Sequence, residues 1–336
     1  MTNISVCSRK YWLAIINKTQ KMNLLFPEIE AYASNYIDTG DGHTIYLEQA
    51  GNPEGIPVIF LHGGPGSGCN PNHRRYFNPE KYHIVIFDQR GCNRSTPQGT
   101  IKNNTTPDLI LDIERIRKFL NIDKWLVFGG SWGATLGLLY AETYSEHVSG
   151  MILRGAFLAR QSELDWFATL GASRIFPDHW ERFIKEFPPE EQQDLVVAYH
   201  KRLNDNNNAI KEKFARLWSD WATRVVTWNL MEQKNDVEDI KTIVNQVSIE
   251  THYAFNHYFI QENQILNNVS KIPDVPVIII HGRKDLTCTL ESSWSLHKAL
   301  PRSELVIIPD AGHLAGEPAM VDALITATEK MTGLIK

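Results

Sequence analysis

The sequence predicts a doubly wound, mostly parallel α/β sheet that is interrupted by one helical insertion. Three observations predict this fold. Short, continuously apolar runs alternate with helical patterns, and such runs are typical of strands buried on both faces of a parallel sheet. The alternation stops after residue 157 and resumes near residue 271. Residues 158–270 show helical periodicity, charged faces and little strand signal. Strands that alternate with helices build a layered sheet, so the middle block is expected to be inserted into it.

Before the insertion, the pattern predicts five strands and two helices. The run at 44–48 alternates in polarity, and a turn rich in Gly, Asn and Pro follows it. The first helix is expected to begin near Pro107 with Thr106 as its N-cap. Its apolar stripe consists of Leu109, Ile113, Ile116 and Leu120. The second helix is expected at 134–144. The five strands are expected at 44–48, 56–61, 83–87, 125–128 and 149–153.

After the insertion, the same alternation returns. It predicts a strand at 275–280, a helix at 292–300, a strand at 304–308 and a final helix at 319–331. The predicted organisation is therefore an N-terminal extension at 1–21, a core formed by 22–157 and 271–336, and a helical insertion at 158–270.

Charge and hydropathy exclude several classes of function. The 336 residues include 34 Lys and Arg against 39 Asp and Glu, a formal net charge of −5. This balance gives no electrostatic reason to bind nucleic acid or an anionic lipid surface. No apolar run approaches the roughly 20 residues that a membrane-spanning helix needs. We therefore expect neither nucleic acid nor a membrane as a partner, and the oligomeric state stays open.

The cysteines and the N-terminus predict a cytoplasmic location. Four scattered cysteines form no CxxC pair and no metal-finger spacing, so reduced thiols are expected. The first 21 residues carry basic residues around an apolar stretch that is too short for a secretory signal, and no cleavage site follows. Met22 is a second candidate start.

The strongest local motif is Gly129-Gly130-Ser131-Trp132-Gly133, which lies between a predicted strand and a predicted helix. It matches the nucleophile elbow G-x-S-x-G, in which a strained turn exposes a serine above the sheet. The neighbours two positions away lack side chains so that the strand and helix can pass each other. We expect Ser131 to be a catalytic nucleophile.

A serine hydroxyl needs a base, and His313 is the expected one. It lies in the loop after the last predicted strand, and the histidine comes last in chain order in this architecture. His62, His281 and His297 are competitors. His281 lies at a strand end and His297 on a helix, so structural roles are expected for both.

The expected orienting carboxylate is Asp285, directly after the strand at 275–280. It would hold the imidazole in the required tautomer and stabilise the imidazolium that forms during attack. Asp310 is the rival, but it is only three residues from His313 and is expected to shape that turn. Asp88 and Asp274 are expected to be structural.

Two backbone N–H groups are expected to form an oxyanion hole. One belongs to Trp132 at the helix start, and the other to Gly64 in the loop His62-Gly63-Gly64-Pro65-Gly66. This loop matches neither the P-loop nor the dinucleotide fingerprint. The constellation needs no cofactor, and no metal-ligand spacing occurs, so neither is expected.

With these residues in place, the sequence resembles the prolyl iminopeptidase family, serine peptidases of the α/β-hydrolase fold. The resemblance extends from about Phe26 to Pro318. It rests on 39–43 (TGDGH), 61–66 (LHGGPG), 88–92 (DQRGC), 94–97 (RSTP), 129–133 (GGSWG), 153–155 (LRG), 171–173 (GAS), 176–178 (FPD), 282–285 (GRKD) and 311–313 (AGH). It implies that Ser131, Asp285 and His313 form a triad and that the insertion is a cap over the active site. It also implies release of N-terminal proline from small peptides.

The cap departs from the family pattern at two positions. The family is expected to hold the substrate's free amine with two acidic residues there, but this chain has Ala222 and Phe255 at those positions. Neither side chain can supply a charge-assisted partner for an ammonium group. Asp220 and Glu232 lie nearby in sequence and are interpreted as solvated helix charges. Smaller departures are Asn93 in place of a usual glycine and Thr289 in place of a common proline.

Three hypotheses follow for the function. The leading one is a serine aminopeptidase that releases N-terminal proline, or a small apolar residue, through an acyl-enzyme on Ser131. The alternative is an esterase, an amidase or an aminopeptidase of altered specificity, which the missing cap glutamates favour. A catalytically silent binding protein is the third. Five cap tryptophans would suit an apolar substrate, although aromatics at helical spacing are more often core: Trp166, Trp180, Trp218, Trp221 and Trp228.

Overall fold

A single mixed sheet organises the molecule. The computed structural model describes residues 22–227 and 239–335, so the expectations for 1–21, Trp228 and Glu232 lie outside it. Within the described residues, eight strands are ordered β1-β2-β4-β3-β5-β6-β7-β8. They are β1 Ala31–Asp38, β2 Thr44–Gly51, β3 Ile56–Leu61, β4 Tyr82–Phe87, β5 Trp125–Gly130, β6 Val148–Arg154, β7 Val277–Gly282 and β8 Glu304–Ile308.

The six strands β3 to β8 are parallel to one another, whereas β1 and β2 form an antiparallel edge beside β4. The sequence analysis did not predict β1 as a separate strand. This strand lies at the edge of the sheet and buries none of its residues fully. Its exposed face carries Tyr32 and Tyr36, so the strand lacks the apolar run that marks the central strands.

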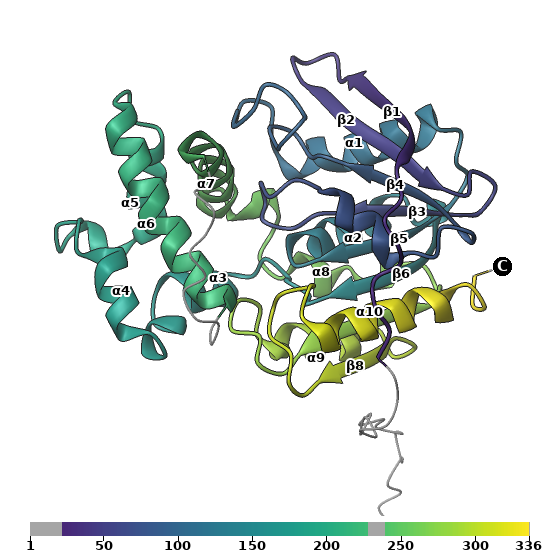
Figure 1. Ribbon diagram of the computed structural model, residues 1–336. Helices are drawn as coiled ribbons and strands as arrows, with labels where there is room; N and C mark the ends of the chain where they lie inside the picture. The colour runs from purple at the N-terminus through teal and green to yellow at the C-terminus, as the bar shows by residue number, and fades with distance from the viewer. Residues whose placement is uncertain (1–21, 228–238, 336) are drawn as a thin grey trace, which may run out of the picture.

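Helices cover both faces of the sheet because alternate strand residues point to opposite sides. Ile59, Val85 and Val127 belong to the apolar core shared with α1, α2 and α9. Their neighbours Val58 and Ile84 belong to the core shared with α10 and the 3₁₀ turn η1. These helices are α1 Thr106–Phe119, α2 Trp132–Thr143, α9 Leu290–Ala299 and α10 Pro318–Met331, and η1 spans Pro71–Tyr76. The doubly wound architecture predicted from the sequence is therefore confirmed, and Figure 1 shows α10 crossing the front of the sheet.

The cap of α1 differs by one residue from its prediction. Thr105, not Thr106, is the N-cap, and it forms a capping box with Asp108. Thr105 has extended backbone angles and its hydroxyl accepts the Asp108 N–H, as an N-cap requires. Thr106 already lies inside the helix, and its hydroxyl donates to the Tyr258 carbonyl.

The insertion between β6 and β7 is helical throughout its described part. Figure 1 shows its longer helices gathered on the left of the sheet. Its helices are α3 Gln161–Ala168, α4 Pro177–Ile184, α5 Leu195–Leu203, α6 Asn208–Thr227, α7 Ile240–Phe255 and α8 Gln264–Asn267. Short 3₁₀ turns are η2 Ser145–His147, before β6, and η3 Ala172–Arg174, η4 Glu191–Gln193, η5 His257–Phe259 and η6 Val269–Lys271 in the insertion.

The insertion has an aromatic core of its own. Trp218 and Trp221 on α6 pack with Phe183 and Tyr199 from α4 and α5, and all four are buried. The Trp166 indole donates to the Leu286 carbonyl and so ties α3 to the loop after β7. The described cap tryptophans are thus mainly core residues. Trp218 alone among them also faces the cavity described below.

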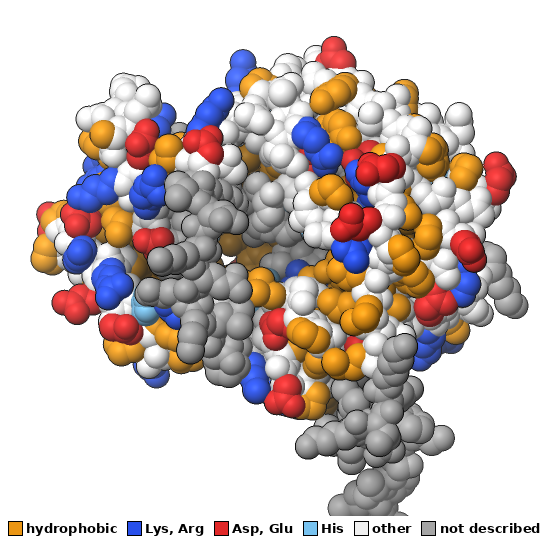
Figure 2. Space-filling view, in the orientation of Figure 1, with side chains coloured by type: hydrophobic (Ala, Val, Ile, Leu, Met, Phe, Trp, Pro, Cys, Tyr) orange, Lys and Arg blue, Asp and Glu red, His pale blue; other side chains and the backbone are white. Residues whose placement is uncertain are grey.

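The helices of the described residues were compared with the length and hydropathy that a membrane span needs. None of the helices in residues 22–227 and 239–335 is both long and apolar enough to cross a bilayer. Figure 2 shows acidic and basic side chains interspersed over the helices of the insertion. This face therefore carries no extended patch of one charge.

Candidate active site

Ser131 occupies the sharp turn between β5 and α2. Its backbone angles are φ 57° and ψ −124°, a conformation that a non-glycine residue adopts only under constraint. The flanking glycines explain the constraint. A Cβ at Gly129 would lie 2.2 Å from the Gly133 carbonyl oxygen, and a Cβ at Gly133 would lie 2.0 Å from the Leu61 oxygen. The G-x-S-x-G pattern is therefore a packing requirement of strand and helix in this chain.

His313 and Asp285 meet although they lie on different loops. His313 follows β8 and Asp285 follows β7, and parallel strands bring both loops to the same sheet edge. His313 Nδ1 donates to Asp285 Oδ2 at 2.7 Å. The other oxygen, Oδ1, accepts the N–H groups of Thr287 and Cys288, each at 2.9 Å. This pair leaves Nε2 of His313 as the ring nitrogen available to a substrate or nucleophile.

The electrostatics of the pair favour an ionised carboxylate. Burial on its own raises the pKa of Asp285, but the facing His313, together with His281 and the Cys288 N–H, lowers it below its usual value. An ionised Asp285 fixes the protonated nitrogen of His313 at Nδ1 and stabilises a positive imidazolium.

Arg154 positions the histidine loop, and the sequence analysis missed this role. It is the last residue of β6, and its guanidinium donates to the His313 carbonyl oxygen at 2.6 Å. The adjacent Gly155 completes the packing, because a Cβ there would lie 3.2 Å from Asp285 Oδ2. The run Leu153-Arg154-Gly155 was noted only as part of a resemblance, since nothing in its residue types points to a loop 159 positions away.

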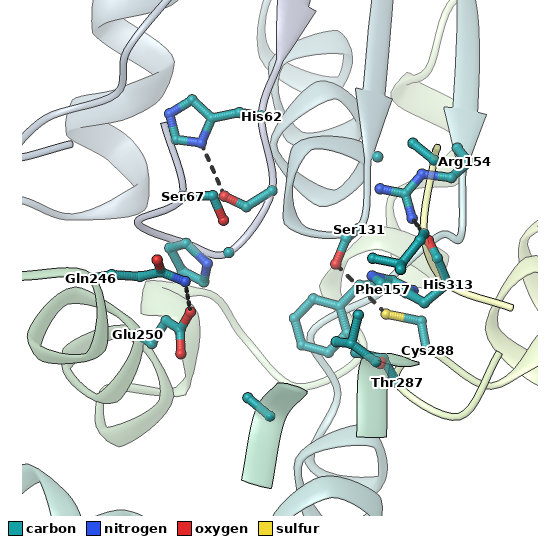
Figure 3. A pocket seen from close by; sticks show the side chains of 18 of the residues that line it. His62, Ser67, Ser131, Arg154, Phe157, Gln246, Glu250, Thr287, Cys288 and His313 are labelled. Atoms are coloured by element: carbon teal, nitrogen blue, oxygen red, sulfur yellow. Dashed lines mark hydrogen bonds between the residues drawn. The ribbon is translucent and has the colours of Figure 1, made fainter. Parts of the chain in front are cut away.

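The Ser131 hydroxyl lines the same cavity as His313 and contacts a cysteine. Its Oγ is 3.8 Å from Cys288 Sγ. Burial raises the pKa of the Cys288 thiol, so this neighbour is neutral. Figure 3 shows Ser131, His313 and Cys288 on one side of a cavity. Catalytic hydrogen bonds are often long before substrate binds and tighten in the complex, so this orientation is compatible with transfer of the serine proton to His313.

The competing histidines have other partners. His281 is fully buried, and its ring nitrogens pair with Ser293 Oγ and the Cys288 carbonyl at 2.6 and 2.8 Å. His297 pairs with Ser303 Oγ at 2.8 Å. His281 thereby fixes the loop that carries Asp285.

His62 links the two predicted oxyanion loops. Its Nε2 accepts the Gln89 N–H at 3.0 Å, and its carbonyl accepts from the Gln89 side chain. The Gln89 amide oxygen in turn accepts from the Trp132 indole at 2.9 Å. Burial lowers the pKa of His62, so the ring is neutral and acts as an acceptor. The motifs at 61–66 and 88–92 therefore form one hydrogen-bonded unit with the start of α2.

The rival carboxylates also have structural partners. Asp310 is exposed and pairs with Lys284 at 3.0 Å. Asp88 is buried and accepts from Arg94 and from the Cys69 N–H, each at 2.7 Å. Asp274 pairs with Arg302 at the surface. None of these contacts reaches His313.

The two predicted oxyanion donors lie at the correct edge of the sheet. Trp132 is the first residue of α2, where a backbone N–H has no partner inside its own helix. Gly64 has φ +109°, a value that L side chains rarely adopt, and lines the same cavity as Ser131. The assignment of these two N–H groups to the oxyanion hole stays a prediction.

A cavity of about 580 Å³ lies between the sheet edge and the insertion. Its size is in the range of small-molecule sites. Ser131 and His313 line one part of it. The walls are largely apolar and come from both regions: Phe60, Leu61, Phe128, Phe157, Leu164, Phe167, Val247, Ala254 and Tyr258. No group of three His, Cys, Asp or Glu in the part of the chain that the structure covers is placed to hold a metal ion.

Comparison with known proteins gives the family. Residues 56–318 match the family model for the alpha/beta hydrolase fold. Proline iminopeptidase from Xanthomonas citri is 47% identical over 310 residues, which cover 92% of this chain and 99% of that protein. The protein of the same name from Arabidopsis thaliana is 47% identical over 93% of this chain and 83% of its own length. The chain belongs to the proline iminopeptidase family.

Solved structures support the fold and nothing finer. An alpha/beta fold family hydrolase from Bacillus anthracis aligns with a TM-score of 0.58 at 19% identity, over 89% of this chain and 100% of that one. A thermophilic esterase from Thermogutta terrifontis aligns with a TM-score of 0.59 at 18% identity, over 90% and 100%.

The two cap positions at which this family member departs from the expected pattern have different surroundings. Ala222, on α6, lines the cavity. Phe255, at the end of α7, is 39% exposed and stacks on the His200 ring at 4.3 Å between centroids. Asp220 lies on the exposed side of α6, as expected for a solvated helix charge. The expectation that Phe255 replaces a cavity residue is therefore wrong for this chain.

A cavity carboxylate that the sequence analysis missed is Glu250 on α7. It lines the cavity and accepts hydrogen bonds from Trp218 and Gln246. The sequence holds one signal for it. Gln246 and Glu250 lie four positions apart on α7, a spacing that places both on one face of the helix.

The smaller departures are accommodated locally. Asn93 has φ 45°, and asparagine tolerates this left-handed region better than most non-glycine residues. Its side chain donates to the Cys69 carbonyl at 2.9 Å. Thr289 is the N-cap of α9 with φ −65°, a value that proline also adopts.

Proposed function

We propose that this chain is a serine aminopeptidase that releases an N-terminal proline, or a small apolar residue, from peptides. One observation carries the proposal: His313, hydrogen-bonded to Asp285 behind it, lines the same cavity as Ser131 on its strained elbow. The proline iminopeptidase relatives supply the substrate class. The catalytic residues are Ser131 as nucleophile, His313 as base and Asp285 as orienting carboxylate.

The reaction follows from this geometry. Ser131 Oγ attacks the carbonyl carbon of the first residue, and its proton passes to His313 Nε2. The oxygen of the tetrahedral intermediate accepts from the backbone N–H groups of Gly64 and Trp132. The intermediate expels the amine of the second residue, which takes the proton from His313. Water, deprotonated by His313, then hydrolyses the acyl-enzyme and restores the Ser131 hydroxyl.

The walls of the cavity suit a small apolar ring. Phe157 and Tyr258 lie edge to face with ring centroids 5.0 Å apart, and both line the cavity. A pyrrolidine ring against these faces would bury apolar area without leaving a polar side-chain atom unpaired. Figure 3 shows Phe157 beside Ser131, where the side chain of the first residue would lie.

A second candidate function keeps the chemistry and changes the substrate. Ala222 leaves an uncharged wall where an acidic residue is expected, which favours an esterase or amidase that does not need a free amine. The two candidates predict different answers to one question, namely whether blocking the substrate's amine abolishes turnover.

The proposal also covers the division of the chain into core and cap and the cellular compartment of the protein. We assign residues 22–157 and 271–336 to the catalytic core and 158–270 to a cap that closes the cavity. The apolar cluster confined to the insertion supports this division. Cys69, Cys92 and Cys288 are buried free thiols, which supports a reducing compartment such as the cytoplasm.

The decisive experiment compares three substrates. Prolyl p-nitroanilide, its N-acetylated form and p-nitrophenyl acetate are assayed in parallel. Turnover of the prolyl amide that N-acetylation abolishes is the expected result. Turnover of the ester alone would reject the aminopeptidase and favour the second candidate. Failure of a fluorophosphonate to label Ser131 would overturn the catalytic assignment and favour the third hypothesis, a binding protein.

A further inference from the structure

Arg154 lines the cavity, and holding the His313 loop uses only a small part of its guanidinium. It is the only lysine or arginine among the described residues that line the cavity. Its backbone oxygen accepts the Ser131 N–H at 2.9 Å, so the residue stands directly beside the nucleophile. Figure 3 shows its side chain next to His313 and across the cavity from Gln246 and Glu250. Its positive charge at this place therefore needs a separate explanation.

The guanidinium of Arg154 has donors to spare. A guanidinium carries five N–H donors. Within residues 22–227 and 239–335, that of Arg154 donates one hydrogen bond, to the His313 carbonyl oxygen, and forms no ion pair. The three buried arginines of the same residues each pair with a carboxylate: Arg74 with Glu48, Arg90 with Asp112 and Arg117 with Glu114. Because a half-buried cation without an anionic partner is unfavourable, this contrast points to an anion that enters from outside.

Gly130 makes room for this side chain. The elbow pattern G-x-S-x-G leaves the position before the serine open, so the elbow itself does not require glycine there. A Cβ at Gly130 would lie 2.3 Å from Arg154 Nη2 and 2.7 Å from its Nε. The glycine therefore lets the guanidinium pack against the backbone of the turn that carries Ser131.

The cavity extends past Arg154 toward η1 and α10. We call this part the sheet-side branch and define it by six of the lining residues: Phe60, His73, Tyr76, Phe128, Arg154 and Leu324. Phe60 stacks on Phe128 with ring centroids 5.4 Å apart, and Tyr76 stacks on Phe128 at 5.9 Å. These rings belong to the apolar cluster on one face of the sheet, whereas Phe157 and Tyr258 pack against the cluster on the other face. The cavity thus has two separate apolar parts, one for each side of the reacting bond.

Arg154 supplies the only charge in the sheet-side branch. Burial, together with the charges of His62 and Arg154, lowers the pKa of His73 to about 4, so this imidazole is neutral at physiological pH. Its ring stacks on Phe60 at 4.4 Å between centroids. Burial raises the pKa of Tyr76, which keeps the phenol neutral as well. An occupant with one negative group and an apolar or aromatic body would match this lining.

The second residue of the substrate is the part that reaches this branch. In the proposed reaction, His313 protonates the leaving amine, so the nitrogen of the second residue lies within hydrogen-bond reach of the His313 ring. In a dipeptide, only the Cα atom separates this nitrogen from the free carboxylate. The Arg154 guanidinium lies 2.6 Å from the carbonyl oxygen of the same histidine. The carboxylate of a dipeptide therefore comes close to the unused guanidinium donors.

We propose that Arg154 binds the C-terminal carboxylate of a dipeptide whose second residue is apolar or aromatic, and that the side chain of this residue occupies the sheet-side branch. The inference rests on the proposed aminopeptidase function and names its substrate class. The carboxylate accepts from the guanidinium N–H groups that the His313 carbonyl leaves unused. A longer peptide carries a neutral amide at this place and lacks the pairing. The walls of the insertion surround the first residue, so the two recognition steps are independent.

The test compares two substrates that differ only at the C-terminus. L-Prolyl-L-phenylalanine ends in a carboxylate and L-prolyl-L-phenylalaninamide ends in a neutral amide, and the second product released from each is quantified by chromatography. We expect kcat/KM of the unmodified protein to be about 10- to 100-fold higher for the free acid, since only the free acid forms a charge-assisted hydrogen bond. Equal values for the two substrates would overturn the inference.

Two variants separate substrate binding from the role of Arg154 in the His313 loop. Arg154→Gln should lower kcat for both substrates and bring the two kcat/KM values to within about twofold of each other, because the positive charge is lost. Arg154→Lys keeps the charge without the planar fork and should retain part of the preference for the free acid. The control Arg302→Gln removes an exposed arginine that pairs with Asp274 and should leave the preference unchanged.

A purely structural role predicts a different pattern. If Arg154 only holds the His313 loop, both variants lower kcat/KM for the two substrates by the same factor, and the preference for the free acid stays as in the unmodified protein. That result would contradict the inference.

Binding without turnover distinguishes failure of this inference from failure of the proposed function. Ser131→Ala and Ser131→Ala/Arg154→Gln are titrated calorimetrically with the free acid and with the amide. Tighter binding of the free acid, found only when Arg154 is present, is the expected result. The same result in a protein that cleaves no prolyl peptide would retain the inference and reject the proposed function. Equal affinity for the two ligands, or no measurable binding of either to Ser131→Ala, would reject the inference.

Discussion

Two regions of the chain line one cavity, and their residues are fixed in different ways. At the sheet edge, the side chains proposed for catalysis lie on loops that the backbone holds in place. Ser131 occupies a strained turn, and Asp285 accepts two backbone N–H groups of its own loop. In the insertion, Ala222 and Glu250 lie within helices α6 and α7, where a substitution alters the cavity wall and leaves the backbone unchanged.

The difference shows which properties of the site can change independently. Replacing one of the side chains that these loops present for catalysis is expected to abolish the reaction. Ala222 on α6 and Glu250 on α7 both line the cavity, so side chains of two helices shape the same wall. We therefore expect reaction type and selection of the substrate's first residue to depend on separate parts of this molecule. The predictions below test that separation from the largest expected effect to the smallest.

The largest effect is expected at the nucleophile. Ser131→Ala should lower kcat for prolyl p-nitroanilide by about 10⁴- to 10⁶-fold, because the covalent step is removed. Fluorophosphonate labelling should disappear in the same variant, and thermal melting should show an intact fold. Residual activity within tenfold of the unmodified protein would place the nucleophile elsewhere.

A smaller but still large effect is expected at the orienting carboxylate. Asp285→Asn should lower kcat by up to about 10⁴-fold, since an amide permits the wrong tautomer of His313. The matched variant is Asp310→Asn, which alters the exposed ion pair with Lys284 and should keep kcat within twofold. Steady-state kinetics of the two variants decide between the two carboxylates. A large loss in Asp310→Asn alone would reverse the assignment.

KM for the substrate should depend on pH through Glu250, which lies in the insertion. Because the pKa of Glu250 is raised to about 6, the carboxylate becomes protonated as the pH falls through 6. KM for the prolyl amide should then rise several-fold between pH 7 and 5. Glu250→Gln should lack this rise, although it keeps the other ionisable side chains that line the described cavity: His62, His73, Tyr76, Arg154, Glu163, Tyr258, Cys288 and His313. An identical pH dependence of KM in both proteins would assign it to one of those neighbours.

The same carboxylate should reduce stability at neutral pH. The pKa of Glu250 in the folded state lies above its usual value of 4.5, so the folded protein binds the proton more tightly than the unfolded chain. The destabilising contribution of the charge is therefore complete above pH 6 and is lost as the pH falls below about 4.5. Glu250→Gln should raise the free energy of unfolding by up to about 2 kcal/mol at pH 8, with little change at pH 4. Urea denaturation at the two pH values measures this.

The smallest effect is expected at Phe255. Its ring is 39% exposed and stacks on His200, away from the cavity. Phe255→Ala should change the stability by no more than about 0.5 kcal/mol, as most surface substitutions do, and should leave kcat/KM unchanged. A tenfold change in KM would show that this end of α7 reaches the substrate.

The sheet and its loops could be predicted from the sequence because their signals are local. Continuous apolar runs mark buried strands, and the glycines around Ser131 are needed by the turn itself. The parallel order then brings His313 and Asp285 to one edge. The edge strand β1 was not predicted because none of its residues is fully buried. The N-cap of α1 was predicted one residue too late because Thr105 and Thr106 are both residues that favour this position.

The cavity wall in the insertion could not be predicted in the same way. Which helical residues face the cavity depends on how α6 and α7 pack, and this packing has no local signature. The sequence analysis assigned the second acidic position of the cap to Phe255, which is partly exposed, and overlooked Glu250, which lines the cavity and precedes a second His-Tyr pair at 252–253. Arg154 was missed for a related reason, since its contact with the His313 carbonyl joins two distant segments.

The central claim is that the loops at the sheet edge perform the reaction and that the cavity wall of the insertion, which includes Glu250, selects the first residue of the substrate. The most direct test is the ratio of kcat/KM for prolyl p-nitroanilide to kcat/KM for p-nitrophenyl acetate, measured in the unmodified protein and in Glu250→Gln. The ester has no amine, so the ratio is expected to fall at least tenfold in the variant. A ratio that stays the same, because both substrates lose activity equally or neither does, would contradict the claim.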